Sequence, residues 1–191
     1  TLAIKILIDP KDGAILGAQA VGAEGVDKRI DVIATAMRAG LTATDLIDLE
    51  LAYAPPFGSA KDPINQLGYI AENRMSGLSE SADWSEIEQL QTSGWKLLDV
   101  RTREEFAEGS IPGATNVPVD ELRDHLDDLR GSDYLVYCAV GQRAHVATQL
   151  LKAHGISAKN LDGGWTTWRN TRTARSLRDV PKKQLVGAAL S

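Results

Sequence analysis

The sequence predicts an α/β fold built from two segments with different patterns. In the second half, short apolar runs alternate with stretches of helical spacing, which is typical of a parallel sheet covered by helices on both faces. In the first half, two β-rich runs precede helical stretches, which indicates an α+β arrangement. The polar, small-residue stretch 75–81 lies between the two patterns and is predicted to be a linker.

The first segment is predicted to open with a β-hairpin. Residues 2–8 form an apolar, β-branched run that ends at the turn Asp9-Pro10-Lys11-Asp12-Gly13, and the strand pattern resumes over 14–21. Helices are then indicated by apolar residues at helical spacing, by stop signals such as Gly40, and by a proline suited to a first turn. These helices are predicted over 26–40, 44–51 and 64–74.

The second segment is predicted to alternate strands with helices. Buried strands are expected over 96–100, 134–137 and 159–161, with a short extended piece at 116–118. Helices are expected over 85–91, from the Thr102 cap onward, over 121–129 and over 143–154. Residues from 171 onward are basic and are predicted to form a loosely ordered tail.

The composition excludes several classes of function. The net charge of −5 argues against nucleic acid as a partner, because phosphate binding needs a basic face. No apolar run approaches the ~20 residues that a membrane span requires. The first residues lack the features of a signal peptide, so a cytoplasmic location is expected. With one cysteine, neither an intrachain disulfide nor a cysteine metal cluster can form, and no metal site is predicted.

The single cysteine lies where a reactive group is expected. A lone cysteine is more often a small buried hydrophobe, but Cys138 follows a predicted strand directly, and ligands bind at the carboxyl ends of parallel strands. Gly141 allows a tight turn, and Arg143 opens a predicted helix. Loop N–H groups and the helix N-terminus would then stabilise a thiolate or a persulfide anion. The sequence therefore favours a nucleophilic thiol at Cys138.

Four motifs in the second segment resemble those of the rhodanese family. They are 98–106, 110–118, the loop 137–144 and 161–165, and together they span about residues 80–170. Ser110 departs from the histidine that many members carry, with little expected effect on the chemistry. The resemblance implies that Cys138 accepts sulfane sulfur from a small-molecule donor and passes it to a thiol or to cyanide. It also implies that Ala139, Val140, Gly141 and Gln142 contact the substrate.

The roles of two arginines stay open. Arg143 either orients an anionic donor or closes the loop by hydrogen bonding. Arg101 is a candidate for substrate binding, although with Asp99 it is expected to brace the sheet edge and the loop rather than to do chemistry. The six-residue loop from Cys138 to Arg143 is one residue shorter than that of the related dual-specificity phosphatases. Sulfur transfer is therefore favoured over phosphatase or arsenate reductase-like activity.

The first segment resembles the carboxyl-terminal dimerisation domain of the pyridine nucleotide–disulfide oxidoreductases. The stretches that carry this resemblance are 1–23, 26–40 and 52–65, and they are most similar to the coenzyme A disulfide reductase and NADH-dependent persulfide reductase group. Some members of that group carry a fused rhodanese domain in the same order. The resemblance implies a homodimer, with Tyr53 either reaching the partner's active site or packing beside Pro55 and Pro56.

The predicted organisation is thus a dimerisation domain over 1–77, a rhodanese-like domain over 78–170 and a basic tail over 171–191. No Gly-x-Gly-x-x-Gly follows a strand, so no cofactor is expected in this chain. FAD, NAD(P)H and coenzyme A are implied for a longer parent flavoenzyme, of which this chain is expected to be the carboxyl-terminal part. Two hypotheses follow, a sulfurtransferase module and a non-catalytic dimerisation or docking fragment.

Overall fold

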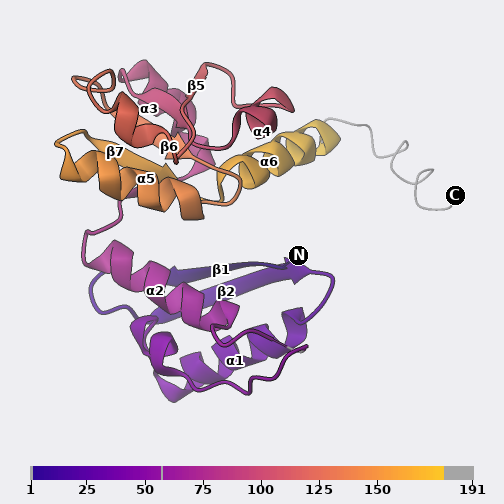
Figure 1. The fold of residues 1–191 in the computed structure, drawn as a ribbon. Helices are drawn as coiled ribbons and strands as arrows, with labels where there is room; N and C mark the ends of the chain where they lie inside the picture. The colour runs from indigo at the N-terminus through magenta and orange to yellow at the C-terminus, as the bar shows by residue number, and fades with distance from the viewer. Residues whose placement is uncertain (1, 57, 179–191) are drawn as a thin grey trace, which may run out of the picture. The chain divides into compact units, whose positions relative to one another are not determined.

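The computed structural model describes residues 2–56 and 58–178, and the chain divides into two compact units, Thr1–Leu78 and Ser79–Ser191 (Figure 1). The first unit has a single apolar core, and the second has two apolar clusters. The fold class predicted from the sequence is confirmed: an α+β region precedes an α/β domain with a parallel sheet. Among the described residues, no helix is long and apolar enough to cross a membrane.

The first unit packs two helices against an antiparallel hairpin. Its elements are β1 (Leu2–Ile8), β2 (Ile15–Gly22), α1 (Val26–Ala39), the 3₁₀ helix η1 (Thr44–Asp48) and α2 (Pro63–Met75). Burial alternates along β1, so that Ile4, Ile6 and Ile8 turn toward the core while their neighbours face outward. Pro63 begins α2, and the Asp62 side chain caps it while also binding Arg29 at 2.9 Å.

The second unit contains a five-stranded parallel sheet in the order β3-β7-β6-β4-β5. Its strands are β3 (Ser81–Ala82), β4 (Lys96–Asp99), β5 (Ala114–Asn116), β6 (Tyr134–Tyr137) and β7 (Ala158–Leu161). Its helices are α3 (Ile87–Thr92), α4 (Arg103–Ala107), α5 (Gln142–Ala153) and α6 (Gly164–Arg178), with 3₁₀ helices η2 (Trp84–Glu86) and η3 (Leu122–His125).

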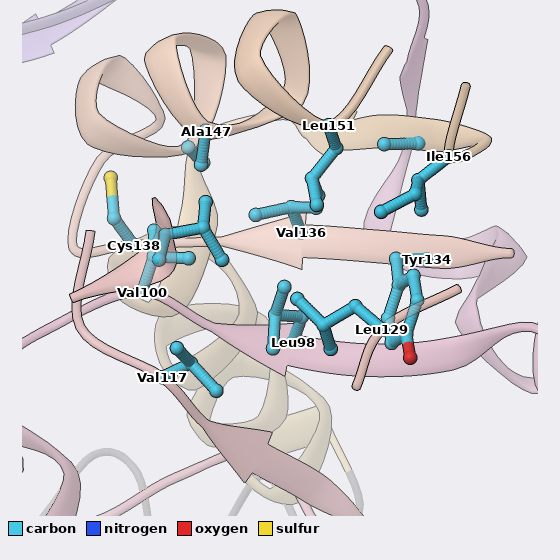
Figure 2. Close-up of a cluster of buried hydrophobic side chains, with 13 residues drawn as sticks. Leu98, Val100, Val117, Leu129, Tyr134, Val136, Cys138, Ala147, Leu151 and Ile156 are labelled. Atoms are coloured by element: carbon cyan, nitrogen blue, oxygen red, sulfur yellow. The ribbon is translucent and has the colours of Figure 1, made fainter. Parts of the chain in front are cut away.

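The two faces of this sheet are covered by different helices. Leu98 and Val136 pack with residues of α5 on one face, as Figure 2 shows for Ala147 and Leu151. Leu97 and Leu135, which alternate with them, pack on the other face with residues of α3 and α6. All four residues of β6 are buried, because this strand lies at the centre of the sheet. The residue that follows it, Cys138, therefore lies at the carboxyl edge of the central strand.

Several predictions of local structure differ from the structure. The helix predicted over 44–51 is the 3₁₀ helix η1, which ends at Asp48, and the extended piece predicted at 116–118 is the strand β5, Ala114–Asn116. The predicted linker 75–81 ends in the edge strand β3, which is too short to produce an apolar pattern. The predicted helix 121–129 is reduced to η3, and its buried residues Leu122 and Leu129 fill the core without a regular helix between them. The predicted tail begins inside α6, which continues to Arg178 with Trp165 and Trp168 packed on the core, and residues 179–191 lie outside the described part of the chain.

Candidate active site

Cys138 lies directly after β6, with its sulfur turned toward the loop that leads into α5. The residue is 1 % exposed, and its Sγ accepts a hydrogen bond from the backbone N–H of Gly141 at 3.1 Å. Figure 2 shows the sulfur at one edge of the buried cluster, beyond the arrowhead of β6 and away from Leu129 and Tyr134. We call residues 138–142 the sulfur loop.

The sulfur loop turns sharply at Gly141, which is the N-cap residue of α5. Its φ of 111° is a conformation that residues with a Cβ rarely adopt, so glycine is required here. This turn places the first backbone N–H groups of a 12-residue helix beside the loop. Because these groups carry the positive end of the helix dipole, they favour an anion at the end of β6.

The outer side of the sulfur loop is held by β7 and α6. The N–H groups of Trp165 and Thr166, at the start of α6, donate to the carbonyls of Cys138 at 2.8 Å and Ala139 at 3.0 Å. Asn160 on β7 donates through Nδ2 to the Gly141 carbonyl at 3.1 Å. The loop is thus fixed by donors that the sequence analysis did not single out.

Arg143 on the first turn of α5 is paired with Glu105 on α4. Two guanidinium nitrogens donate to the two carboxylate oxygens, each at 2.7 Å. Hydrogen bonding from Arg143 lowers the pKa of Glu105 from 4.5 to about 2, against burial, which raises it. The pKa of Arg143 is raised, first by its hydrogen bonds to Glu105 and also by its interaction with Cys138, while burial lowers it. The guanidinium therefore lies within electrostatic reach of the sulfur.

Arg101 and Asp99 form a buried ion pair at the carboxyl end of β4. The residues are 3 % and 0 % exposed, and Arg101 Nη2 lies 2.6 Å from Asp99 Oδ2 and 2.7 Å from the Gly109 carbonyl. Burial lowers the pKa of Arg101, but the bonds and charge of Asp99 raise it further, so the net shift is upward. This arrangement fits a bracing role, because the donors of Arg101 point at protein acceptors rather than at an open surface.

The other predicted site residues are spread over two environments. Within the sulfur loop, Ala139 is half-buried, Val140 is 63 % exposed, and Gln142 is exposed at the start of α5. Tyr53 belongs to the first unit, is 54 % exposed and lies in a stretch without helix or strand.

Three participants in this site were missed by sequence reasoning. Glu105 was predicted to lie in a helix capped by Thr102, and that cap is present, but nothing in the pattern indicates its ion pair with Arg143. Asn160 was placed on a strand without a role. The start of α6 was expected to be only the end of a strand motif, although Gly163-Gly164 followed by Trp165 is a signal that could have indicated a close backbone approach.

The arrangement supports chemistry on a sulfur anion. The Cys138 thiol has no disulfide partner and accepts a hydrogen bond from the Gly141 backbone N–H. It also lies at the N-terminus of α5 and interacts with the Arg143 guanidinium. Each of these stabilises a thiolate, or a persulfide whose outer sulfur is charged.

In comparisons with known proteins, the two units match the models of two different domain families. Residues 1–63 match the model of the pyridine nucleotide-disulphide oxidoreductase dimerisation domain, and residues 83–171 match that of the rhodanese-like domain. The coenzyme A disulfide reductase of Staphylococcus aureus (strain bovine RF122 / ET3-1) is 49 % identical over 71 residues, which are 37 % of this chain and 16 % of that protein.

Two solved structures resemble both units. Reduced CoADR-RHD of Bacillus anthracis superposes with a TM-score of 0.85 and 45 % identity, over 87 % of this chain and 30 % of that one. A NAD-dependent persulfide reductase from A. fulgidus superposes with a TM-score of 0.78 and 36 % identity, over the same shares. The chain thus spans less than a third of the length of these relatives. It belongs to the pyridine nucleotide-disulphide oxidoreductase dimerisation domain family in its first unit and to the rhodanese-like domain family in its second.

Proposed function

We propose that the second unit is a sulfurtransferase in which Cys138 carries sulfane sulfur as a persulfide. The observation that supports this most directly is the contact between Cys138 Sγ and the Gly141 N–H at the head of α5, within a rhodanese-like domain. The proposal assigns Cys138 as the nucleophile, Ala139, Val140, Gly141 and Gln142 as the residues around the incoming sulfur, and Arg143 as the nearby cation.

The proposed reaction has two displacement steps. The Cys138 thiolate attacks the outer sulfur of a donor such as thiosulfate or an organic persulfide. A new S–S bond forms to Cys138, while the S–S bond of the donor breaks and its electron pair leaves on sulfite or on a thiolate. An acceptor thiolate then attacks the outer sulfur of the Cys138 persulfide and takes it, which regenerates the Cys138 thiolate.

The protein's contribution is to stabilise the sulfur anion in both states. In this proposal the Gly141 N–H, which donates to Cys138 Sγ, and the N-terminus of α5, which begins at the next residue, stabilise the negative charge of the thiolate or persulfide. Arg143 adds a positive charge, and its bidentate pairing with Glu105 restricts where that charge can move. Arg143 therefore assists by orienting an anionic donor without losing its own partner.

The proposal also includes the reaction of a longer parent enzyme that contains this chain. Coenzyme A disulfide reductases and a persulfide reductase are among the relatives, so we propose that a parent enzyme using FAD, NAD(P)H and coenzyme A reduces the sulfur that Cys138 receives. The described residues do not fit a dinucleotide, because none of their parallel strands is followed by a Gly-x-Gly-x-x-Gly turn. No step in this chain is therefore assigned to those groups. The dimerisation domain supports a homodimer, in which Tyr53 is the candidate to reach a partner.

The test is intact-protein mass spectrometry after brief incubation with thiosulfate or polysulfide, with Cys138→Ser in parallel. We expect the wild type to gain the mass of one sulfur, the variant to gain nothing, and a thiol to reverse the gain. An aryl phosphate should remain unhydrolysed under the same conditions. A wild type that takes sulfur from neither donor contradicts the proposal.

A second candidate function is a dimerisation or docking fragment without turnover. It is favoured by exposed apolar side chains on the hairpin of the first unit, namely Leu7, Leu16 and Val21. The same incubation separates the two candidates, because a docking fragment does not exchange sulfur on Cys138 and the sulfurtransferase does.

A further inference from the structure

Asn160 lies on β7 beside the sulfur loop without being part of it. Its Nδ2 donates to the Gly141 carbonyl at 3.1 Å. A Cβ placed on Gly141 would lie 3.8 Å from that same Nδ2, so the carboxamide lies beside the Cα of the glycine. Asn160 thus contacts the residue at which the loop turns.

The contact fixes the group that touches the sulfur. The Gly141 carbonyl accepts from Asn160 and also from the His145 N–H at 2.9 Å, while the Gly141 N–H donates to Cys138 Sγ at 3.1 Å. Glycine changes its backbone dihedral angles easily. The two donors on its carbonyl therefore hold Gly141 at its φ of 111°. The direction of the N–H bond is therefore set in part from β7.

The other half of the carboxamide shows that Asn160 is not there for stability alone. Among the described residues, Asn160 Oδ1 is buried and has no hydrogen-bond partner. The same holds for Oγ of Ser81, the residue that pairs with Asn160 across the β3–β7 register. A buried polar atom without a partner is destabilising, and an apolar side chain at this position would avoid that cost. The feature that Asn160 provides and an apolar residue cannot is the bond to the loop.

We propose that Asn160 is a positioning residue for Cys138, which holds the Gly141 carbonyl and so orients the Gly141 N–H toward the sulfur. It does not touch the transferred sulfur, and it acts through Gly141. The inference rests on the proposed function, because it assumes that Cys138 carries sulfur. The geometry of the loop does not depend on which donor supplies that sulfur.

The test compares Asn160→Leu with wild type in the full chain, with Ser81→Ala as the matched control. Both changes remove a buried polar atom without a partner, but only the first removes the bond to Gly141. The rate at which Cys138 gains sulfur from polysulfide is followed by mass spectrometry. We expect Asn160→Leu to load about ten- to a hundredfold more slowly, since loss of a whole anion-stabilising donor costs about 10²–10³ and here the donor is misaligned rather than removed. Ser81→Ala should load at the wild-type rate.

Two further readouts separate positioning from a structural role. The Gly141 amide resonance in a ¹H–¹⁵N spectrum should move in Asn160→Leu and stay in Ser81→Ala, because only the first changes its hydrogen bond to the sulfur. The rate of Cys138 alkylation by iodoacetamide should fall with the loading rate. A variant that melts earlier but loads and alkylates as wild type does, with an unmoved Gly141 resonance, overturns the proposal.

Failure of the inference is distinguishable from failure of the proposed function. If the wild type takes no sulfur, the sulfurtransferase proposal is wrong, while alkylation and the Gly141 resonance still report on Asn160. If the wild type takes sulfur and Asn160→Leu takes it equally fast, the sulfurtransferase proposal stands and the role of Asn160 is refuted.

Discussion

At the scale of single residues, Glu105 joins two helix starts that are far apart in the sequence. One of its oxygens accepts from the Thr102 backbone N–H at 2.9 Å, which closes the capping box of α4. Both oxygens accept from Arg143 at the start of α5. The Glu105 carboxylate therefore holds the Arg143 guanidinium close to Cys138 and also completes the cap of α4. A substitution by glutamine removes its charge and keeps its shape, so the two effects can be tested separately.

The stability that Glu105 provides should depend on pH in a defined direction. Its pKa is lowered from 4.5 to about 2, so its contribution is fully present above about pH 4.5 and is lost as the pH falls toward 2. Glu105→Gln keeps the shape and the acceptor for Thr102. Because the pair is partly exposed to solvent, we expect the variant to lose only about 1 kcal/mol of unfolding free energy at pH 6. The difference from wild type should shrink steadily below pH 4.5.

Urea unfolding at several pH values measures this, with tryptophan fluorescence as the signal. All four tryptophans, Trp84, Trp95, Trp165 and Trp168, belong to the second unit, so the signal reports on that unit alone. In an Arg143→Gln background, Glu105→Gln should have almost no further effect, because the partner is gone. A free-energy difference that stays constant from pH 6 to pH 2.5 would contradict the assigned pair.

At the scale of elements, the start of α6 is a support for the sulfur loop. Gly164 has a φ of +54°, and a Cβ there would lie 2.3 Å from the Cys138 carbonyl oxygen, which is backbone and cannot move aside as a side chain could. The close approach lets the next two N–H groups of α6 reach the carbonyls of Cys138 and Ala139. The glycine is therefore required for the contact between helix and loop, and not only for the turn.

Gly164→Ala should destabilise the second unit and slow sulfur loading together. The left-handed backbone costs roughly 1 kcal/mol with a Cβ, and the forced separation of α6 from the loop should raise the total to roughly 3 kcal/mol. Gly155→Ala is the matched control, since Gly155 has a φ of +74° with nothing within 4 Å of its Cβ position. Gly155→Ala should lose only the roughly 1 kcal/mol of unfolding free energy that the left-handed backbone costs, and it should load sulfur at the wild-type rate. Equal losses in the two variants would show that α6 does not support the loop.

The sequence predicts the elements that follow a strong pattern and misses those that depend on tertiary contacts. The strand 134–137 agrees residue for residue with β6, because four consecutive buried side chains leave a clear apolar run. The helix α6 was not predicted, because most of its residues are polar and the packing of Trp165 and Trp168 is visible only in the fold. The Glu105–Arg143 pair spans 38 residues, and no local pattern relates positions at that separation.

At the scale of the whole molecule, each unit has the core it needs to fold. The apolar cluster of the first unit draws its buried members from residues 15–71, and the two clusters of the second unit draw theirs from residues 82–161. The hydrogen bonds described for the sulfur loop, from Gly141, Asn160, Trp165 and Thr166, all come from the second unit as well. The chemistry and the core that supports it are thus encoded in one continuous piece of chain.

Residues 79–191 should therefore fold and accept sulfur without the first unit. Cutting between Leu78 and Ser79 removes no member of the two clusters and no hydrogen-bond donor of the sulfur loop. We expect the piece to unfold in urea at a midpoint close to that of the full chain, judged by tryptophan fluorescence, and to gain sulfur on Cys138 at a rate within about twofold. Residues 1–78 supply the control, since they contain no cysteine and should gain no sulfur mass. A piece that folds but no longer loads would mean that the first unit, including Tyr53, takes part in the chemistry, and the assignment of the site to the second unit alone would be wrong.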